Sequence, residues 1–486
     1  MQTEYGELLL GVSGHYVDEA LVETTADAAD RGGVTKVLSL EADVKTTGAE
    51  LLEGEAEVGG KVNYRLLYLD RQERLCGLDY FKDFKCRVKG EAITPSGRCR
   101  VRFSVPDAEA TLRGDEILLS AMVGVGLDYF DEKSEKIVTA VSEAETLKGS
   151  IPTQTTLLTQ RTVELEKVIE SGPKVKKIVL FGTDALPVKV ERRDGGNDLV
   201  GEVRVSVLYL NEADEVVEVG ATIPFTESFE AGNATYDVAV KNARIVLTDD
   251  EGGGAIEVEA TVTVDEFAYV YEEKEVLAAA VGESKEAIET LVPLSCEKCL
   301  GQHCYEQPLV GTIPVKEGGY VAFVRPGCHA IAEVSVTEGA VRVEGVAAFQ
   351  AALLSEGGYT AAQGELPFSY TLPFDGAKEG QSAEAKVIVT DAKGNMGEGG
   401  VAVGAKIAVE VTFFERESSA YLSDVTEGEA YPESEAGISV YFAEKGEDVW
   451  SIAKAMKALP SALVQANPFL EGALEEDKKV LILRKK

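Results

Sequence analysis

The sequence predicts a mainly β protein, with three tandem antiparallel β-sandwich-like repeats followed by a small βααβ domain. Three observations lead to this prediction. Apolar and polar residues alternate over residues 203–209 and 258–264, which is typical of half-buried antiparallel strands. A related pattern recurs three times in the 486 residues. The segment from residue 438 onward differs from the repeats, because part of it has the apolar periodicity of helices.

Each copy of the repeat begins with a strand led by a glycine. These glycines are Gly54, Gly201 and Gly345, so the copies are 147 and 144 residues apart. An aliphatic-Leu-Tyr strand and an Ile/Leu-Pro-Phe strand follow, most completely at residues 208–209 and 223–225. Internal similarity at a fixed spacing indicates one structural unit used repeatedly.

Each copy closes on a long strand with aromatic residues near its end, at residues 118–130, 256–271 and 401–414. We therefore expect repeats at residues 1–147, 148–292 and 293–425, each a sandwich of roughly 100–120 residues. In these repeats a helix is expected only in connecting segments, such as residues 284–291.

The segment 438–486 predicts a strand, two helices and a closing strand. An alternating apolar run at 438–442 forms the first strand, and Gly446 turns the chain. Asp448 is a candidate N-cap for the first helix, and Pro460 suits the first turn of the second. Asn467 and Pro468 then stop that helix. The preceding residues 426–437 are rich in glutamate and predict an acidic linker.

Charge and composition exclude several classes of function. The formal net charge of −36 argues against nucleic acid and anionic membrane as direct partners. No apolar run is long enough to cross a bilayer, so we expect no membrane insertion. The sequence begins without a basic region ahead of an apolar segment, which predicts no secretory signal and a cytoplasmic protein. No nucleophile or phosphate-loop motif is present, so we expect no enzyme activity.

Four of the seven cysteines have a spacing that could hold zinc. They are Cys296 and Cys299 in one Cys-x-x-Cys motif, followed by Cys304 and Cys328. Thiolates at such spacing can bind zinc tetrahedrally, although no standard finger spacing is present. The alternative is that these are reduced thiols without a metal, in a chain that needs no cofactor.

The run from Gly446 to Ala453, with the downstream Asn467-Pro468, resembles a LysM module. Three β units followed by a LysM module resemble the SPOCS-domain spore-coat morphogenetic proteins. This resemblance implies a scaffold or adaptor of endospore coat assembly in the mother-cell cytoplasm, at the forespore outer surface. It also implies that the LysM module contacts the coat-basement ATPase, SpoIVA, besides other coat proteins.

The LysM resemblance also implies where a partner or a glycan would bind. The implied residues lie in two loops: Gly446, Glu447, Asp448, Val449, Ala466, Asn467, Pro468 and Phe469. The alternative function is binding of peptidoglycan through its N-acetylglucosamine units. Residues 475–477 are Glu-Glu-Asp where LysM modules usually have a Pro-Gly-Gln-like turn, and this difference favours a protein partner.

Overall fold

The computed structural model describes residues 1–27, 32–114, 116–250, 253–315, 318–431, 437–470 and 472–483. Strands dominate, which confirms the prediction of a mainly β protein built from small antiparallel sheets. The first six strands are β1 (Thr3–Asp27), β2 (Lys36–Leu52), β3 (Glu55–Leu69), β4 (Leu75–Lys89), β5 (Arg98–Arg113) and β6 (Glu116–Val141).

Two further groups of six strands follow. The second group is β7 (Ala144–Glu170), β8 (Val175–Arg193), β9 (Gly196–Asn211), β10 (Val216–Phe229), β11 (Ala234–Asp250) and β12 (Gly253–Gly282). The third is β13 (Lys285–Pro314), β14 (Tyr320–Thr337), β15 (Ala340–Ser355), β16 (Gly358–Pro373), β17 (Ser382–Gly397) and β18 (Gly400–Ala430). We call these groups unit 1, unit 2 and unit 3, and together the body.

The strand order is the same in all three units. In each unit the first, sixth and fifth strands form one sheet, and the second, third and fourth form another. In unit 1, for example, the orders are β1-β6-β5 and β2-β3-β4. The alternating apolar residues of the two sheets form one hydrophobic cluster in each unit, as in a sandwich.

A glycine opposite a phenylalanine sets the common register of the units. Gly60 pairs with Phe84, Gly201 with Phe225 and Gly345 with Phe368. The expected equivalence of Gly54 with Gly201 is therefore wrong, because Gly54 lies in the β2–β3 turn at φ 78°. A Cβ atom added to Gly60 or Gly201 would lie 2.4 or 2.3 Å from the paired ring. The glycine thus makes room for the ring to lie on the strand.

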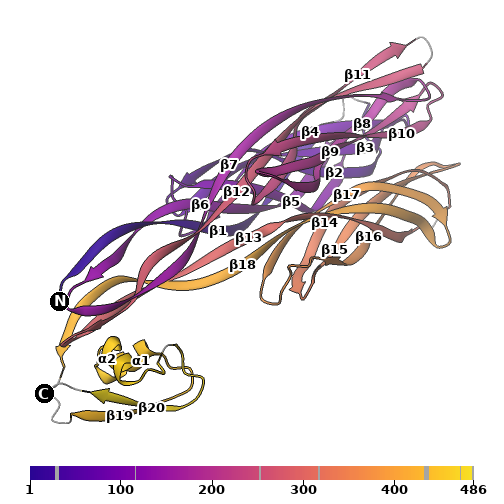
Figure 1. The fold of residues 1–486 in the computed structure, drawn as a ribbon. Helices are drawn as coiled ribbons and strands as arrows, with labels where there is room; N and C mark the ends of the chain where they lie inside the picture. Colours follow the sequence, from indigo (N-terminus) through magenta and orange to yellow (C-terminus); the bar gives the residue numbers. More distant parts are fainter. Residues whose placement is uncertain are drawn as a thin grey trace.

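Equivalent positions of the three units meet, as around an approximate threefold axis. Leu67, Leu208 and Ala352, each seven residues after the paired glycine, share one cluster. The long first and last strands of each unit form two-stranded ribbons that converge on one end of the body (Figure 1). We call this end the tip. There Val138, Leu277 and Leu422 pack together in another shared cluster.

The segment expected to be a connecting helix is a strand, so this prediction is wrong. Residues 285–291 belong to β13 and pair with β18 up to Ala430. Ribbon pairing and the packing of Ala287 at the tip override the local helical preference. The units meet at residues 142–143 and 283–284, earlier than expected. Of the expected linker, residues 426–430 are strand, and residues 432–436 lie outside the described part.

Residues 437–483 form the small C-terminal module. Its elements are β19 (Ile438–Ala443), α1 (Val449–Met456), α2 (Pro460–Ala466) and β20 (Lys478–Leu483), with β19 antiparallel to β20. Both helices cover the same face of this two-stranded sheet, on the side toward the tip (Figure 1). Neither helix of the described chain is long and apolar enough to cross a membrane.

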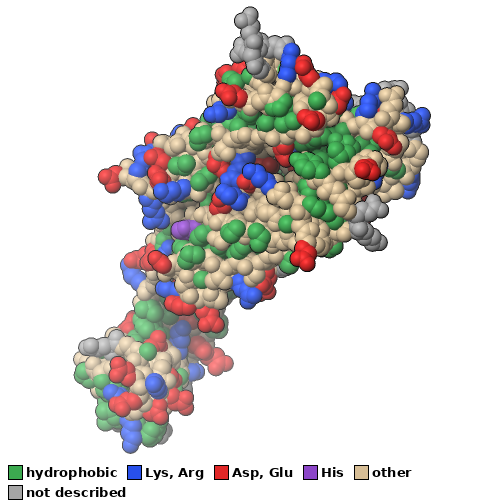
Figure 2. Space-filling model, turned by 90° about the vertical axis from the view of Figure 1, so that its right-hand side faces the viewer, with side chains coloured by type: hydrophobic (Ala, Val, Ile, Leu, Met, Phe, Trp, Pro, Cys, Tyr) green, Lys and Arg blue, Asp and Glu red, His purple; other side chains and the backbone are tan. Residues whose placement is uncertain are grey.

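Charged side chains of both signs are intermixed over the surface. Figure 2 shows this on one face, with apolar side chains gathered toward the end of the body away from the module. The acidic excess of the chain therefore does not form a single acidic surface on that face.

Candidate functional site

The first predicted loop of the module caps α1. Asp448 accepts a hydrogen bond from the Ser451 backbone N–H at 2.8 Å, and the Ser451 hydroxyl contacts the Asp448 N–H at 3.0 Å. This capping box confirms Asp448 as the N-cap. Glu447 accepts a hydrogen bond from the Tyr441 hydroxyl at 2.9 Å. Gly446 has φ 95° and donates to the Leu474 carbonyl at 2.8 Å.

The second predicted loop has one buried and two exposed members. Asn467 is only 2% exposed, and its side chain joins α2 to β20. Its Nδ2 donates to the carbonyls of Leu463 and Leu481 at 2.9 and 2.7 Å, and its Oδ1 accepts from the Leu481 N–H at 2.8 Å. Pro468 and Phe469 are exposed, with Ala466 half-buried. Asn467 therefore holds the module together, whereas Pro468 and Phe469 lie exposed at its surface, with Lys478 Nζ 5.2 Å from the centre of the Phe469 ring.

Val449, the last residue of the first loop, packs in the module core. This core includes one residue of the body, Val281 of β12, which is 2% exposed. Two polar contacts join the same surfaces: Lys454 Nζ lies 2.6 Å from a Glu289 carboxylate oxygen, and the Ser461 N–H donates to Glu145 at 2.9 Å. The module thus lies directly against the tip, with apolar and charged contacts.

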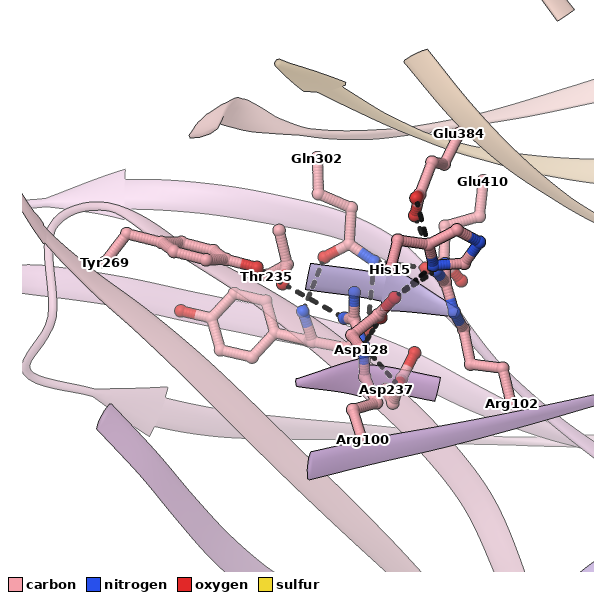
Figure 3. A network of polar contacts seen from close by, with 11 residues as sticks. His15, Arg100, Arg102, Asp128, Thr235, Asp237, Tyr269, Gln302, Glu384 and Glu410 are labelled. Carbon is pink, nitrogen blue, oxygen red and sulfur yellow. Dashed lines mark hydrogen bonds and ion pairs between the residues drawn. The ribbon is translucent and has the colours of Figure 1, made fainter. Parts of the chain in front are cut away.

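A polar network with a buried centre joins the three units deeper in the body (Figure 3). Arg100 Nε lies 2.7 Å from Asp128 Oδ2, and Arg102 Nη2 lies 2.9 Å from Asp128 Oδ1. Arg102 also lies 2.6 Å from Glu384 of unit 3. Arg100 reaches Asp237 of unit 2 at 3.7 Å. We call this set of charges the junction network.

Neighbouring neutral groups extend the junction network. Gln302 of unit 3 accepts from the Tyr236 N–H of unit 2 at 2.7 Å and donates to the Tyr236 carbonyl at 2.8 Å. The Gln302 amide also donates to Glu410 at 2.6 Å. Thr235 lies 3.1 Å from the Tyr269 hydroxyl within unit 2. Breaking the junction would leave several of these buried groups without partners, at a cost of about 1–3 kcal/mol for each group.

The charges of the junction shift the pKa values of its members. Burial acts to raise the pKa of Asp128, but the His15 hydrogen bond and the two arginines lower it below its ordinary value. His15 Nδ1 lies 2.7 Å from Asp128 Oδ1. This hydrogen bond raises the pKa of His15 against the opposing effect of burial. Asp128 is therefore a carboxylate, and His15 readily becomes an imidazolium beside it.

Among the described residues, one group of three side chains could geometrically hold a metal ion. His15, Asp128 and Glu384 have ligand atoms within 4.8 Å of one another. However, Arg100 and Arg102 already pair with these two carboxylates. A cation would have to displace both guanidinium groups, so the donor set fits an ion-pair network better than a metal site.

The four cysteines predicted to hold zinc are spread along two strands. Cys296, Cys299 and Cys304 lie on β13, and Cys328 lies on β14. Strand residues advance about 3.3 Å each, so Cys296 and Cys304 are roughly 25 Å apart. A tetrahedral site with zinc–sulfur distances of about 2.3 Å cannot include both. The predicted zinc site is therefore not formed, because the motif lies on an extended strand.

Without a metal, burial also favours the protonated form of these thiols. It raises the pKa of Cys296 to about 11 and that of Cys299 to about 12, whereas zinc binds thiolates. Cys296 pairs across the ribbon with Glu417, the position that Leu10 and Thr153 occupy in units 1 and 2. All three are buried, so Cys296 serves as a small core side chain.

The sequence analysis did not identify the junction network or a second one like it. In the second network Arg325 of unit 3 pairs with Glu41 of unit 1 and lies 3.2 Å from Glu218 of unit 2. The available signal was a charged residue inside an apolar strand, as in the buried run Leu127-Asp128-Tyr129. Such a residue needs a partner, but the sequence does not say which one.

Comparison with protein-family models gives a match. Residues 33–113 match the family model described as SipL, SPOCS domain. No curated protein and no solved structure matches the chain. The matched segment contains β2 to β5, which unit 2 repeats as β8 to β11 and unit 3 as β14 to β17. The match supports a SPOCS, SipL-like family for this segment and a sporulation-related role for the chain.

Proposed function

We propose that this protein is a non-enzymatic scaffold of endospore coat assembly. The observation that carries the proposal is the SPOCS-domain match at residues 33–113, together with the same strand order in three successive units. On this proposal, each unit is a SPOCS-like repeat and the C-terminal module is a LysM domain. The protein acts in the mother-cell cytoplasm, at the forespore outer surface.

The arrangement of the body supports a scaffold. Its three units share apolar clusters at the tip and near the other end, and two ion-pair networks connect them. The charged groups of the junction network that could act as an acid or a base form ion pairs with one another. The body is thus suited to hold the module at one end and to present its surface to other coat proteins.

The partner proposed for the module is a coat-basement ATPase of the SpoIVA type. Neither nucleic acid nor a membrane is proposed as a partner, because the net charge of −36 opposes anionic surfaces. The alternative is peptidoglycan binding by the LysM loops. Exposed Phe469 beside Pro468 favours this alternative, since it offers an apolar floor for an acetylated sugar.

A capture experiment tests the proposal. The full chain and a chain ending at residue 430 are each immobilised and exposed to a lysate of sporulating cells. We expect the full chain to retain the SpoIVA-type ATPase and the truncated chain to lose it. Retention by the truncated chain would assign the contact to the body. Failure of both to retain any coat protein would contradict the scaffold function.

A further inference from the structure

The two-stranded sheet of the module has one uncovered apolar face. Five large apolar side chains on this face are between 43% and 69% exposed: Ile438, Val440, Phe442, Leu481 and Leu483. We call this surface the outer face. The opposite face carries Ala443, Val480 and Ile482, which are buried under α1 and α2.

The outer face is continuous, because its residues pair across the two strands. Ile438 lies opposite Leu483, Val440 opposite Leu481, and Phe442 opposite Lys479. Figure 1 shows both helices on the other side of the sheet, toward the body, so no described element covers this face. Contiguous apolar surface of this kind marks an interaction site more often than scattered single residues do.

The charge of the outer face differs from that of the rest of the chain. Acidic residues outnumber basic ones by 84 to 48 overall, yet β19 and β20 contain no carboxylate, and one of their two lysines, Lys479, lies on the outer face. Lys479 Nζ lies 5.4 Å from the centre of the Phe442 ring, at the margin of the face. A ligand that fits is therefore apolar in its centre and acidic at its margin.

The size of the outer face indicates what form the ligand takes. Six residues of strand extend about 20 Å, and two strands lie about 4.8 Å apart. A helix is about 10–12 Å wide, and about thirteen residues span 20 Å. One amphipathic helix of three to four turns would thus cover the whole face.

We propose that the outer face binds an amphipathic helix of a partner protein, with an apolar stripe and carboxylates beside it. The inference rests on the proposed scaffold function, and it assigns the contact to the sheet instead of the loops at 446–449 and 466–469. A second copy of the chain fits less well, because two chains of net charge −36 each repel each other. An anionic lipid surface is much larger than one helix, so it would also face the acidic remainder of the chain and be repelled.

The test uses the full chain and a fluorescent helical peptide of about fourteen residues, with leucines along one side and glutamates at its margins. The double variant Val440→Lys, Leu481→Lys changes the centre of the face. Val464→Lys, at an exposed apolar position of α2, is the matched control. Trp450 fluorescence and circular dichroism verify that every variant is folded.

We expect the peptide to bind wild type, and to bind the double variant at least about tenfold more weakly. The Val464→Lys control should remain within about twofold, and a peptide with lysine margins should bind wild type at least about tenfold more weakly. Equal binding by the double variant would overturn the inference. So would a wild-type dimer in sedimentation velocity that the double variant abolishes, or preferential binding to phosphatidylserine vesicles.

Capture from lysate separates this inference from the proposed function. If the double variant retains the coat ATPase while the chain ending at residue 430 loses it, the assignment of the contact to the outer face is wrong and the scaffold function stands. If the full chain retains no coat protein but still binds the acidic peptide, the scaffold function is wrong and the outer face remains a helix-binding surface.

Discussion

Asn467→Ala should strongly destabilise the module without any ligand being involved. The Asn467 side chain makes three hydrogen bonds, and the alanine variant leaves the Leu481 N–H without that acceptor. Each such bond contributes about 1 kcal/mol net, and a buried group left unpaired costs about 1–3 kcal/mol. We therefore expect a loss of about 2–4 kcal/mol in the free energy of unfolding of the module.

Urea unfolding followed by tryptophan fluorescence measures this loss directly. Trp450 is the only tryptophan of the chain and packs against the module core, so its signal reports on the module. The matched control is Gln465→Ala, an exposed residue of the same helix, which should change the free energy by less than about 0.5 kcal/mol. A change of that small size for Asn467→Ala would refute the structural role and return this residue to the binding surface.

Three further predictions concern the body. Gly201→Ala should lower the thermal unfolding temperature of the body, because the new Cβ would lie 2.3 Å from the Phe225 ring and reduce the free energy of unfolding by about 1–3 kcal/mol. The control is Gly404→Ala, where a Cβ meets nothing within 4 Å. The pKa of His15 is raised in the folded state, so the contribution of His15 to the free energy of unfolding is full below about pH 6.5 and is lost as pH rises through the folded pKa. His15→Gln should therefore flatten that part of the stability–pH curve. An unchanged curve would contradict the pairing with Asp128. Protein purified without added metal should hold well under one zinc per chain by elemental analysis, with no further loss in Cys296→Ser; one zinc per chain that this substitution removes would restore the metal site.

The sequence was sufficient where a local pattern determines the structure. The alternation at residues 203–209 predicted a strand, and Asp448 and Pro460 were correctly predicted at the starts of the two helices. These features depend on side chains and backbone only a few residues apart, so the local sequence contains the information.

The sequence was insufficient where the partner is distant. Gly54 and Gly60 look alike in a sequence, and only the cross-strand neighbour Phe84 distinguishes them. The Cys296–Cys299 motif has the same spacing in a loop as on a strand, but only a loop can turn both thiols toward one metal. Arg102 and Glu384 are 282 residues apart, and no periodicity predicts that they meet.

The most direct test of the scaffold function is binding between purified components. Binding of the SpoIVA-type ATPase is measured for the full chain and for the chain ending at residue 430. Binding of soluble muropeptides is measured for the full chain. We predict that the full chain binds the ATPase, that truncation abolishes this binding, and that calorimetry detects no muropeptide binding. Micromolar muropeptide binding by the full chain, with no binding to the ATPase, would contradict the scaffold function and support the glycan-binding alternative.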